Sequence, residues 1–295
     1  MKKSKQHKNN FSAKLMLAYT TFVILFTASI SKATEKFYIP SNPQAKAPLF
    51  VVLHGCLSDA QDMESISRFS EFAEIHGFYV FYPEPKDEKA KGCFEFFTED
   101  SQKPGGGDSF IIVNKVQQYL KDYDIDPNKV FVAGMSAGSS IIPTLINCYP
   151  DVFHGAALHS GMGYGLVTNW QESLWVAQTG PMKNKARLDY CNSSNYKGKV
   201  FVIHGTKDKV MNPKNFTLVR NDYLPELSSK TERYPATADV YGYKRKYYYR
   251  DNAMVGQTLL VNGMAHDWSG GKPRSIFSHY GPDVTPMIIE FFLYN

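Results

Sequence analysis

Several residue types and patterns are scarce in this chain, and each scarcity excludes a class of protein. Cysteine occupies only 4 of 295 positions, too few for a disulfide-dense miniprotein. The 16 prolines and 21 glycines follow no collagen-like period, and we find no internal repeat, low-complexity tract or linker. With 43% hydrophobic and 21% charged residues, the composition is that of a folded chain rather than a disordered one. We therefore expect one globular domain.

Acidic residues are missing from the first 33 positions, which hold six lysines. These lysines account for the formal net charge of +5, because the rest of the chain has one more acidic than basic residue. A near-neutral body predicts no nucleic acid or other polyanion as a partner.

The lysine-rich start leads into an apolar stretch at 15–30 and then into Ser31-Lys32-Ala33, which places small residues where a signal peptidase cuts. This order predicts a secretory signal peptide over residues 1–33 and a mature domain over residues 34–295. A retained membrane anchor is the alternative, although the stretch is shorter than the ~20 residues of a spanning helix. We expect a secreted or periplasmic protein with no stable membrane association after cleavage.

The cysteines lack the spacing of a metal site. They are Cys56, Cys93, Cys148 and Cys191. In an exported chain these four could form two disulfides, with three possible pairings. Neither a C-x-x-C nor an H-E-x-x-H spacing is present, so we expect no metal site. The histidines His54, His159 and His204 all fall near strand ends, which leaves a zinc cluster as a weak alternative.

From about residue 47, short apolar runs alternate with helical patterns. The runs expected to be strands are 49–53, 78–82, 130–133, 155–158 and 200–203. Helices are expected over about 63–75, from a cap at Asp108 or Ser109, and from about 137. Continuous apolar strands between helices indicate an α/β fold, with a mostly parallel sheet flanked by helices in a single domain.

Two regions interrupt this alternation. Residues 162–198 have no clear period, which suits an excursion over the strand ends. Residues 241–261 predict a hairpin that turns at Asp251-Asn252. Its Tyr/Lys/Arg run at 243–249 could also stack on single-stranded nucleic acid, but the near-neutral body favours a strand with one solvated face.

A G-x-S-x-G segment, Gly134 to Gly138, lies between a predicted strand and a predicted helix. In that context the motif is typical of a nucleophile turn, which exposes the Ser136 hydroxyl at the edge of the sheet. The N–H of Ala137 would then point to where an oxyanion forms. A glycine-rich packing turn is the alternative reading.

A serine nucleophile needs a base and an orienting carboxylate, and in this architecture the chain order is Ser, acid, His. Asp208 follows the strand at 200–203 and is the candidate acid, with a plain turn residue as the alternative. His266 lies before the apolar helix at 286–293 and is the candidate base; His279 is the second choice.

The second oxyanion donor should come from the loop after the first core strand. The Cys56 N–H is the candidate there, with the Leu57 N–H second. We expect His54 to be a structural hydrogen-bonding residue, and the mechanism requires no cofactor.

These motifs resemble the polyhydroxybutyrate depolymerase-like esterases of the α/β-hydrolase fold. The resemblance extends from about residue 48 to residue 293. It is carried by His54-Gly55-Cys56, Gly92-Cys93-Phe94, the 105–108 turn, the segment 126–138, the segment 204–208 and the segment 262–271. It implies that residues 34–295 form the catalytic domain, with Ser136 as nucleophile, Asp208 as acid and His266 as base. With this resemblance in view, we hypothesise that Cys56 pairs with Cys93 and that Cys148 pairs with Cys191.

The resemblance implies a serine esterase acting on short hydroxyacyl polyesters or their oligomers. Relatives that remove feruloyl or acetyl groups from plant polysaccharide make a carbohydrate esterase the alternative. Two departures stand out: Pro143 falls within the helix after Ser136, and no polymer-binding module follows the domain, which favours soluble oligomers. A peptidase fits less well, and a non-catalytic binding protein on the same fold is the alternative of another class. The oligomeric state is not predicted.

Overall fold

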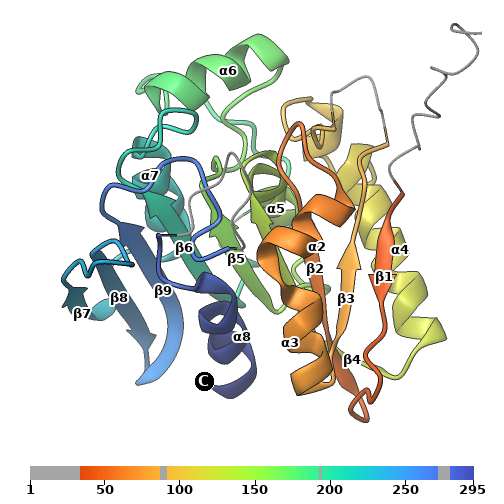
Figure 1. The fold of residues 1–295 in the computed structure, drawn as a ribbon. Coiled ribbons are helices and arrows are strands. Elements are labelled where there is room, and N and C mark those ends of the chain that lie inside the picture. Colours follow the sequence, from red (N-terminus) through yellow and green to blue (C-terminus); the bar gives the residue numbers. More distant parts are fainter. Residues whose placement is uncertain (1–33, 87–91, 193–194, 272–279) are drawn as a thin grey trace, which may run out of the picture. The chain divides into compact units, whose positions relative to one another are not determined.

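A nine-stranded sheet forms the centre of the described part of the protein (Figure 1). The structure is a computed structural model that describes residues 34–86, 92–192, 195–271 and 280–295. The expected signal peptide and His279 lie outside these ranges. In spatial order the strands are β1 (Lys36–Tyr38), β3 (Tyr79–Tyr82), β2 (Ala47–Leu53), β4 (Ile125–Met135), β5 (Gly155–His159), β6 (Lys199–Gly205), β9 (Ala253–Val261), β8 (Tyr243–Arg250) and β7 (Ser228–Tyr234).

The six strands from β3 to β9 in this order run parallel, as the sequence predicts, and the outer strands pair antiparallel. The register brings the carboxyl ends of the central strands to one edge. Met135 of β4 pairs with His159 of β5, and Gly205 of β6 pairs with Val261 of β9. The loops that carry the candidate site residues therefore begin side by side.

Helices cover both faces of the sheet (Figure 1). One face packs against α4 (Gly107–Asp122), α5 (Ala137–Cys148) and α7 (Lys214–Tyr223), and the other against α2 (Ala60–Ser67), α3 (Phe69–His76) and α8 (Val284–Tyr294). Strand β2 shows why both faces are dry: Leu49 and Val51 enter the first core, and Phe50 and Val52 the second. This alternation of fully buried apolar side chains explains the unbroken apolar run in the sequence.

Two local predictions are wrong. The helix expected over 63–75 is two helices, because Arg68 adopts a left-handed backbone (φ 61°) between α2 and α3. The cap expected at Asp108 or Ser109 is absent, since Gly106 is the N-cap of α4 and makes no side-chain cap bond. The Asp108 carboxylate instead accepts the N–H groups of Lys86 and Glu95, each at 2.9 Å, and so holds the preceding loop.

The predicted hairpin is present as β8 and β9, with positive φ at both Asp251 and Asn252, as a tight two-residue turn requires. Strand β7 lies outside it and was not predicted, because its side chains are mostly exposed and polar. The aperiodic region contains α6 (Trp170–Thr179). A short 3₁₀ helix, Asp100–Gln102, lies elsewhere, on the loop before α4.

Both hypothesised disulfides are confirmed. Cys56 is bonded to Cys93 and Cys148 to Cys191. They close loops of 37 and 43 residues, and each is worth about 4 kcal/mol in the chain-entropy account. Among the described helices, none has the length and apolar character needed to cross a membrane.

Candidate active site

Ser136 sits at the turn between β4 and α5 with φ 58° and ψ −118°, a backbone conformation that side chains rarely adopt. Its neighbours must be small. A Cβ on Gly134 would lie 2.6 Å from the Gly138 carbonyl oxygen, and a Cβ on Gly138 would lie 2.4 Å from that of His54. The two glycines of the motif are therefore steric requirements of this turn.

The loop after β2 packs directly on Ser136. A Cβ on Gly55 would be 3.1 Å from the Ser136 Cβ and 3.7 Å from its Oγ. Cys56 follows Gly55, and its disulfide to Cys93 fixes the loop. On the other side, the Ala137 N–H is one of the first in α5 and has no carbonyl four residues back within the helix. The two predicted oxyanion donors, the N–H groups of Cys56 and Ala137, thus directly follow the two residues in contact, Gly55 and Ser136.

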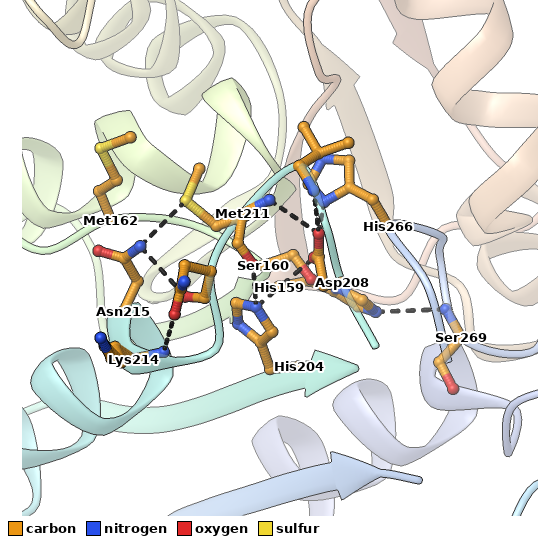
Figure 2. Close-up of polar contacts among 12 residues, drawn as sticks. His159, Ser160, Met162, His204, Asp208, Met211, Lys214, Asn215, His266 and Ser269 are labelled. Carbon is orange, nitrogen blue, oxygen red and sulfur yellow. Dashed lines mark hydrogen bonds and ion pairs between the residues drawn. The ribbon is translucent and has the colours of Figure 1, made fainter. Parts of the chain in front are cut away.

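Asp208 is clamped on both carboxylate oxygens (Figure 2). Oδ2 accepts a hydrogen bond from His266 Nδ1 at 2.7 Å, while Oδ1 accepts the N–H groups of Val210 at 3.0 Å and Met211 at 2.7 Å. Burial opposes ionisation of this carboxyl, but the His266 and Met211 hydrogen bonds outweigh it and lower the pKa below the ordinary 3.8. Asp208 is therefore an ionised, oriented acceptor for an imidazole.

The loops that carry Asp208 and His266 are tied to each other. The Lys207 N–H donates to the Met264 carbonyl at 3.0 Å, and the Gly263 N–H donates to Thr206 Oγ1 at 2.9 Å. The His266 side chain is 16% exposed, so it stays accessible from the solvent side. Because Nδ1 is engaged with Asp208, Nε2 is the nitrogen available to a hydroxyl group.

The structure brings Asp208 and His266 into direct contact, but it does not bring all candidates into contact. Within the described residues, Ser136 Oγ and His266 make no hydrogen bond. The candidate nucleophile and the loop of the candidate base are instead linked through His159: its carbonyl accepts the Ser136 N–H at 3.0 Å, and its Nε2 accepts the Ser269 N–H at 3.2 Å. The hydrogen bond between a serine hydroxyl group and a histidine base is often long in the absence of substrate and tightens when substrate binds.

The sequence alone suggests His159 and His204 only as possible metal ligands, but the structure gives them other contacts. His204 Nε2 lies 2.8 Å from the Met211 carbonyl oxygen and 3.5 Å from Asp208 Oδ2. The signal was present in the chain, since both histidines lie at the ends of buried strands, where polar side chains need partners. In the ranges that the structure covers, no three His, Cys, Asp or Glu side chains are grouped as metal ligands.

His54 is a structural residue, as expected. Its ring is fully buried, lies tilted against Phe94 with the ring centroids 4.8 Å apart and places Nε2 3.2 Å from a Glu84 carboxylate oxygen. Glu84 also accepts the Ala60 N–H at 2.6 Å, so this group joins the loop after β2 to the start of α2.

Comparison with known proteins identifies the family and the fold. The family model described as esterase PHB depolymerase matches residues 34–242, more than half of the chain. The chain is 30% identical over 240 residues to poly(3-hydroxyalkanoate) depolymerase C of Paucimonas lemoignei, covering 78% of this chain and 57% of that protein. It is 29% identical over 191 residues to acetylxylan esterase A of Aspergillus oryzae, covering 61% of this chain and 62% of the other. The matched segment thus spans about six-tenths of the length of these relatives.

Solved structures share the fold. An acetyl xylan esterase from Aspergillus awamori superposes with a TM-score of 0.64 at 21% identity, covering 82% of this chain and 90% of that one. An acylaminoacyl peptidase from Pyrococcus horikoshii gives a TM-score of 0.56 at 15% identity, covering 88% and 38%. At such identities the likeness concerns architecture alone, and it confirms the α/β-hydrolase fold. With that fold and the family match, the chain belongs to the esterase PHB depolymerase family.

Proposed function

We propose that this protein is an exported serine esterase with Ser136, His266 and Asp208 as its catalytic triad. The observation that carries the proposal is the 2.7 Å hydrogen bond between Asp208 and His266 at the same sheet edge as the strained Ser136 turn. A serine hydroxyl is a weak nucleophile, and a histidine oriented by a buried carboxylate is the usual means of activating it.

In this mechanism Ser136 Oγ attacks the ester carbonyl while His266 Nε2 takes the hydroxyl proton. Asp208 holds the tautomer with the proton on Nδ1 and stabilises the imidazolium that forms. His266 then returns the proton to the leaving alcohol. Water, activated by the same imidazole, hydrolyses the acyl-enzyme and frees Ser136.

The backbone N–H groups of Cys56 and Ala137 are the proposed oxyanion donors. Their support is the contact between Gly55 and Ser136 and the position of Ala137 at the amino end of α5, where the helix dipole favours negative charge. Loss of one such donor costs about 10²–10³-fold in kcat in enzymes of this kind.

The proposed substrates are short-chain hydroxyacyl esters of the poly(3-hydroxybutyrate) type. The family match and the likeness to a poly(3-hydroxyalkanoate) depolymerase support this choice. The likeness to acetylxylan esterases supports a second candidate, an esterase acting on polysaccharide acyl groups with the same residues. The two disulfides support export through an oxidising compartment, and we propose residues 34–295 as the catalytic domain.

The test compares initial hydrolysis rates on hydroxybutyrate oligomers, methyl ferulate and acetylated xylan. Preference for the oligomers supports the polyester assignment, whereas preference for either of the others moves the substrate to plant cell walls. Ser136→Ala should abolish both turnover and labelling by a fluorophosphonate. Ser139→Ala is the matched control, because this serine of α5 is buried and its Oγ has no hydrogen-bond partner in the described structure. Activity that survives in Ser136→Ala would contradict the proposal, and a folded wild type that hydrolyses nothing would favour a non-catalytic binding role.

A further inference from the structure

His159 contacts both halves of the candidate site, although neither the proposed triad nor the proposed oxyanion donors include it; Figure 2 shows its ring beside Asp208 and its hydrogen bond to Ser269. Its main-chain carbonyl accepts the Ser136 N–H at 3.0 Å. Its ring Nε2 accepts the backbone N–H of Ser269 at 3.2 Å. Ser269 lies on the loop that carries His266, so one residue connects the nucleophile turn with the loop of the proposed base.

The hydrogen bonds determine the tautomer of this ring. A backbone N–H can only donate, so Nε2 must carry a lone pair and not a proton. The single ring proton of the neutral imidazole is then on Nδ1, where Ser160 Oγ lies 3.2 Å away. A doubly protonated ring would set one N–H against another at Ser269, and the link would be lost.

The loop beyond His266 is anchored on its far side as well. Trp268 is buried, stacks on the His159 ring at 5.2 Å and donates its indole N–H to Thr285 Oγ1 at 3.0 Å. Ser269 Oγ donates to the Pro282 carbonyl at 2.7 Å. These contacts hold the loop against α8, whereas the His159 ring is its link toward the nucleophile.

The charged and titratable groups around the ring keep it neutral. Burial comes first, and His204 and His266 add to it, while Asp208 opposes them; together they lower the His159 pKa to about 3. The acceptor at Nε2 is therefore present throughout the pH range in which an imidazole base can act.

We propose that His159 is a positioning residue that sets the distance of the His266 imidazole from Ser136 by accepting the Ser269 N–H. This role rests on the proposed function, since it matters for turnover only if His266 is the base. A displacement of about 1 Å in such a pair can cost about 10²-fold in rate. The residue touches no reacting atom and acts only through the loop that it holds.

Two substitutions at His159 distinguish the effect of the hydrogen-bond acceptor at Nε2 from the effect of the volume that the ring fills. In His159→Gln the side-chain amide oxygen can reach the place of Nε2 and accept the Ser269 N–H. In His159→Asn the shorter chain reaches only the place of Nδ1. We expect kcat to fall about 10²-fold in the Asn variant with KM within about twofold, and most of that loss to be recovered in the Gln variant. Tyr223→Phe, which removes a buried 3.0 Å bond to Asn147 Oδ1, is the control for lost stability without lost kcat.

A measurement on the unmodified full chain does not depend on how the variants fold. Long-range ¹H–¹⁵N correlation spectra of the histidine rings should show His159 protonated at Nδ1 and bare at Nε2. A proton on Nε2 would overturn the proposal, as would equal kcat in the Gln and Asn variants or a loss no larger than in Tyr223→Phe. Fluorophosphonate labelling of wild-type Ser136 keeps the two hypotheses apart: without labelling the proposed function fails, whereas labelling together with an Nε2 proton rejects only the role of His159.

Discussion

The two halves of the candidate site are held in place by different forces. The nucleophile half is fixed by backbone packing: a methyl group added at Gly134 or Gly138 would collide with backbone atoms, and one added at Gly55 would lie only 3.1 Å from the Ser136 Cβ. The acid–base half is fixed by hydrogen bonds, with both oxygens of Asp208 engaged and the His266 loop held by the His159 ring.

This difference determines what each half tolerates. Steric contacts between backbone atoms do not change with protonation, so the Ser136 turn should be insensitive to pH and intolerant of any added atom. Hydrogen bonds to buried rings and carboxylates depend on the charge state of the groups, so the other half should tolerate isosteric changes only when the donors and acceptors are kept.

The largest expected effect is on the acid–base half. Asp208→Asn keeps the shape and one oxygen for the Val210 and Met211 amides, but it offers His266 an N–H where it needs an acceptor. We expect kcat to fall about 10⁴-fold, as the same change does in an established Ser-His-Asp triad. Steady-state kinetics measures this loss, with Asp222→Asn as control, because Asp222 pairs with Arg187 away from the site. A loss below tenfold would mean that Asp208 only shapes its turn.

The two disulfides test whether the nucleophile half needs its loop fixed. Replacing Cys56 and Cys93 by alanine, or Cys148 and Cys191 by alanine, opens loops of similar size and should cost each variant about 4 kcal/mol of unfolding free energy. Only the first pair includes Cys56, whose backbone N–H is a proposed oxyanion donor, so only that variant should also lose kcat, by about 10-fold or more. Urea unfolding and kinetics at a temperature where both variants are folded would show this. Equal kcat in the two variants would mean that packing on Ser136 holds the loop without the disulfide.

A single methyl group tests the steric argument directly. In Gly138→Ala the new Cβ would lie 2.4 Å and 2.5 Å from the carbonyl oxygens of His54 and Leu53. We expect a loss of about 3 kcal/mol, the upper part of the usual range for overpacking, and loss of activity with it. Gly105→Ala has φ +80° but no neighbour within 4 Å, so it should show only the left-handed backbone penalty of about 1–2 kcal/mol. Similar losses in the two variants would mean that the crowding at Gly138 relaxes.

The sequence predicts the fold and the candidate residues because both leave periodic or positional signals. Continuous apolar runs identified the parallel strands, and the order of Ser136, Asp208 and His266 after successive strands placed them at one edge. The break at Arg68 gave no signal, because a single non-glycine residue in the left-handed region does not alter the apolar pattern. Strand β7 was missed because its exposed polar side chains show no alternation.

The proposed role of His159 could not be predicted from the sequence for a different reason. Its partner Ser269 is distant in the chain, and the contact depends on how far the loop after β9 folds back over β5. A histidine at a strand end is compatible with a ligand, a base or a core acceptor. Only the direction of the Ser269 N–H selects the last of these.

The most gradual expected effect is a pH dependence of stability that belongs to the acid–base half alone. Burial lowers the pKa of His204, and burial followed by neighbouring histidines lowers that of His159 to about 3 from the ordinary 6.5. Below about pH 6.5 the unfolded chain therefore binds protons at these rings that the folded protein does not bind. The free energy of unfolding of the protein falls as the pH drops. The stabilisation is complete above pH 6.5 and is lost on the way toward pH 3, by at most about 1.4 kcal/mol per pH unit for each such ring.

Thermal melts between pH 7.5 and 5 measure this slope in a range above the lowered pKa of Asp208, which therefore contributes nothing to it. His159→Gln removes one of the two rings that bind a proton only in the unfolded chain, so the melting temperature of this variant should vary less with pH than that of the wild type. Gly138→Ala alters only backbone packing, so its curve should be displaced downward with the wild-type slope. If the Gln variant keeps the full slope, the His159 ring is not a source of the pH dependence. If the Ala variant changes the slope, the backbone packing at Gly138 depends on protonation. Either result contradicts the division into a steric half and a polar half.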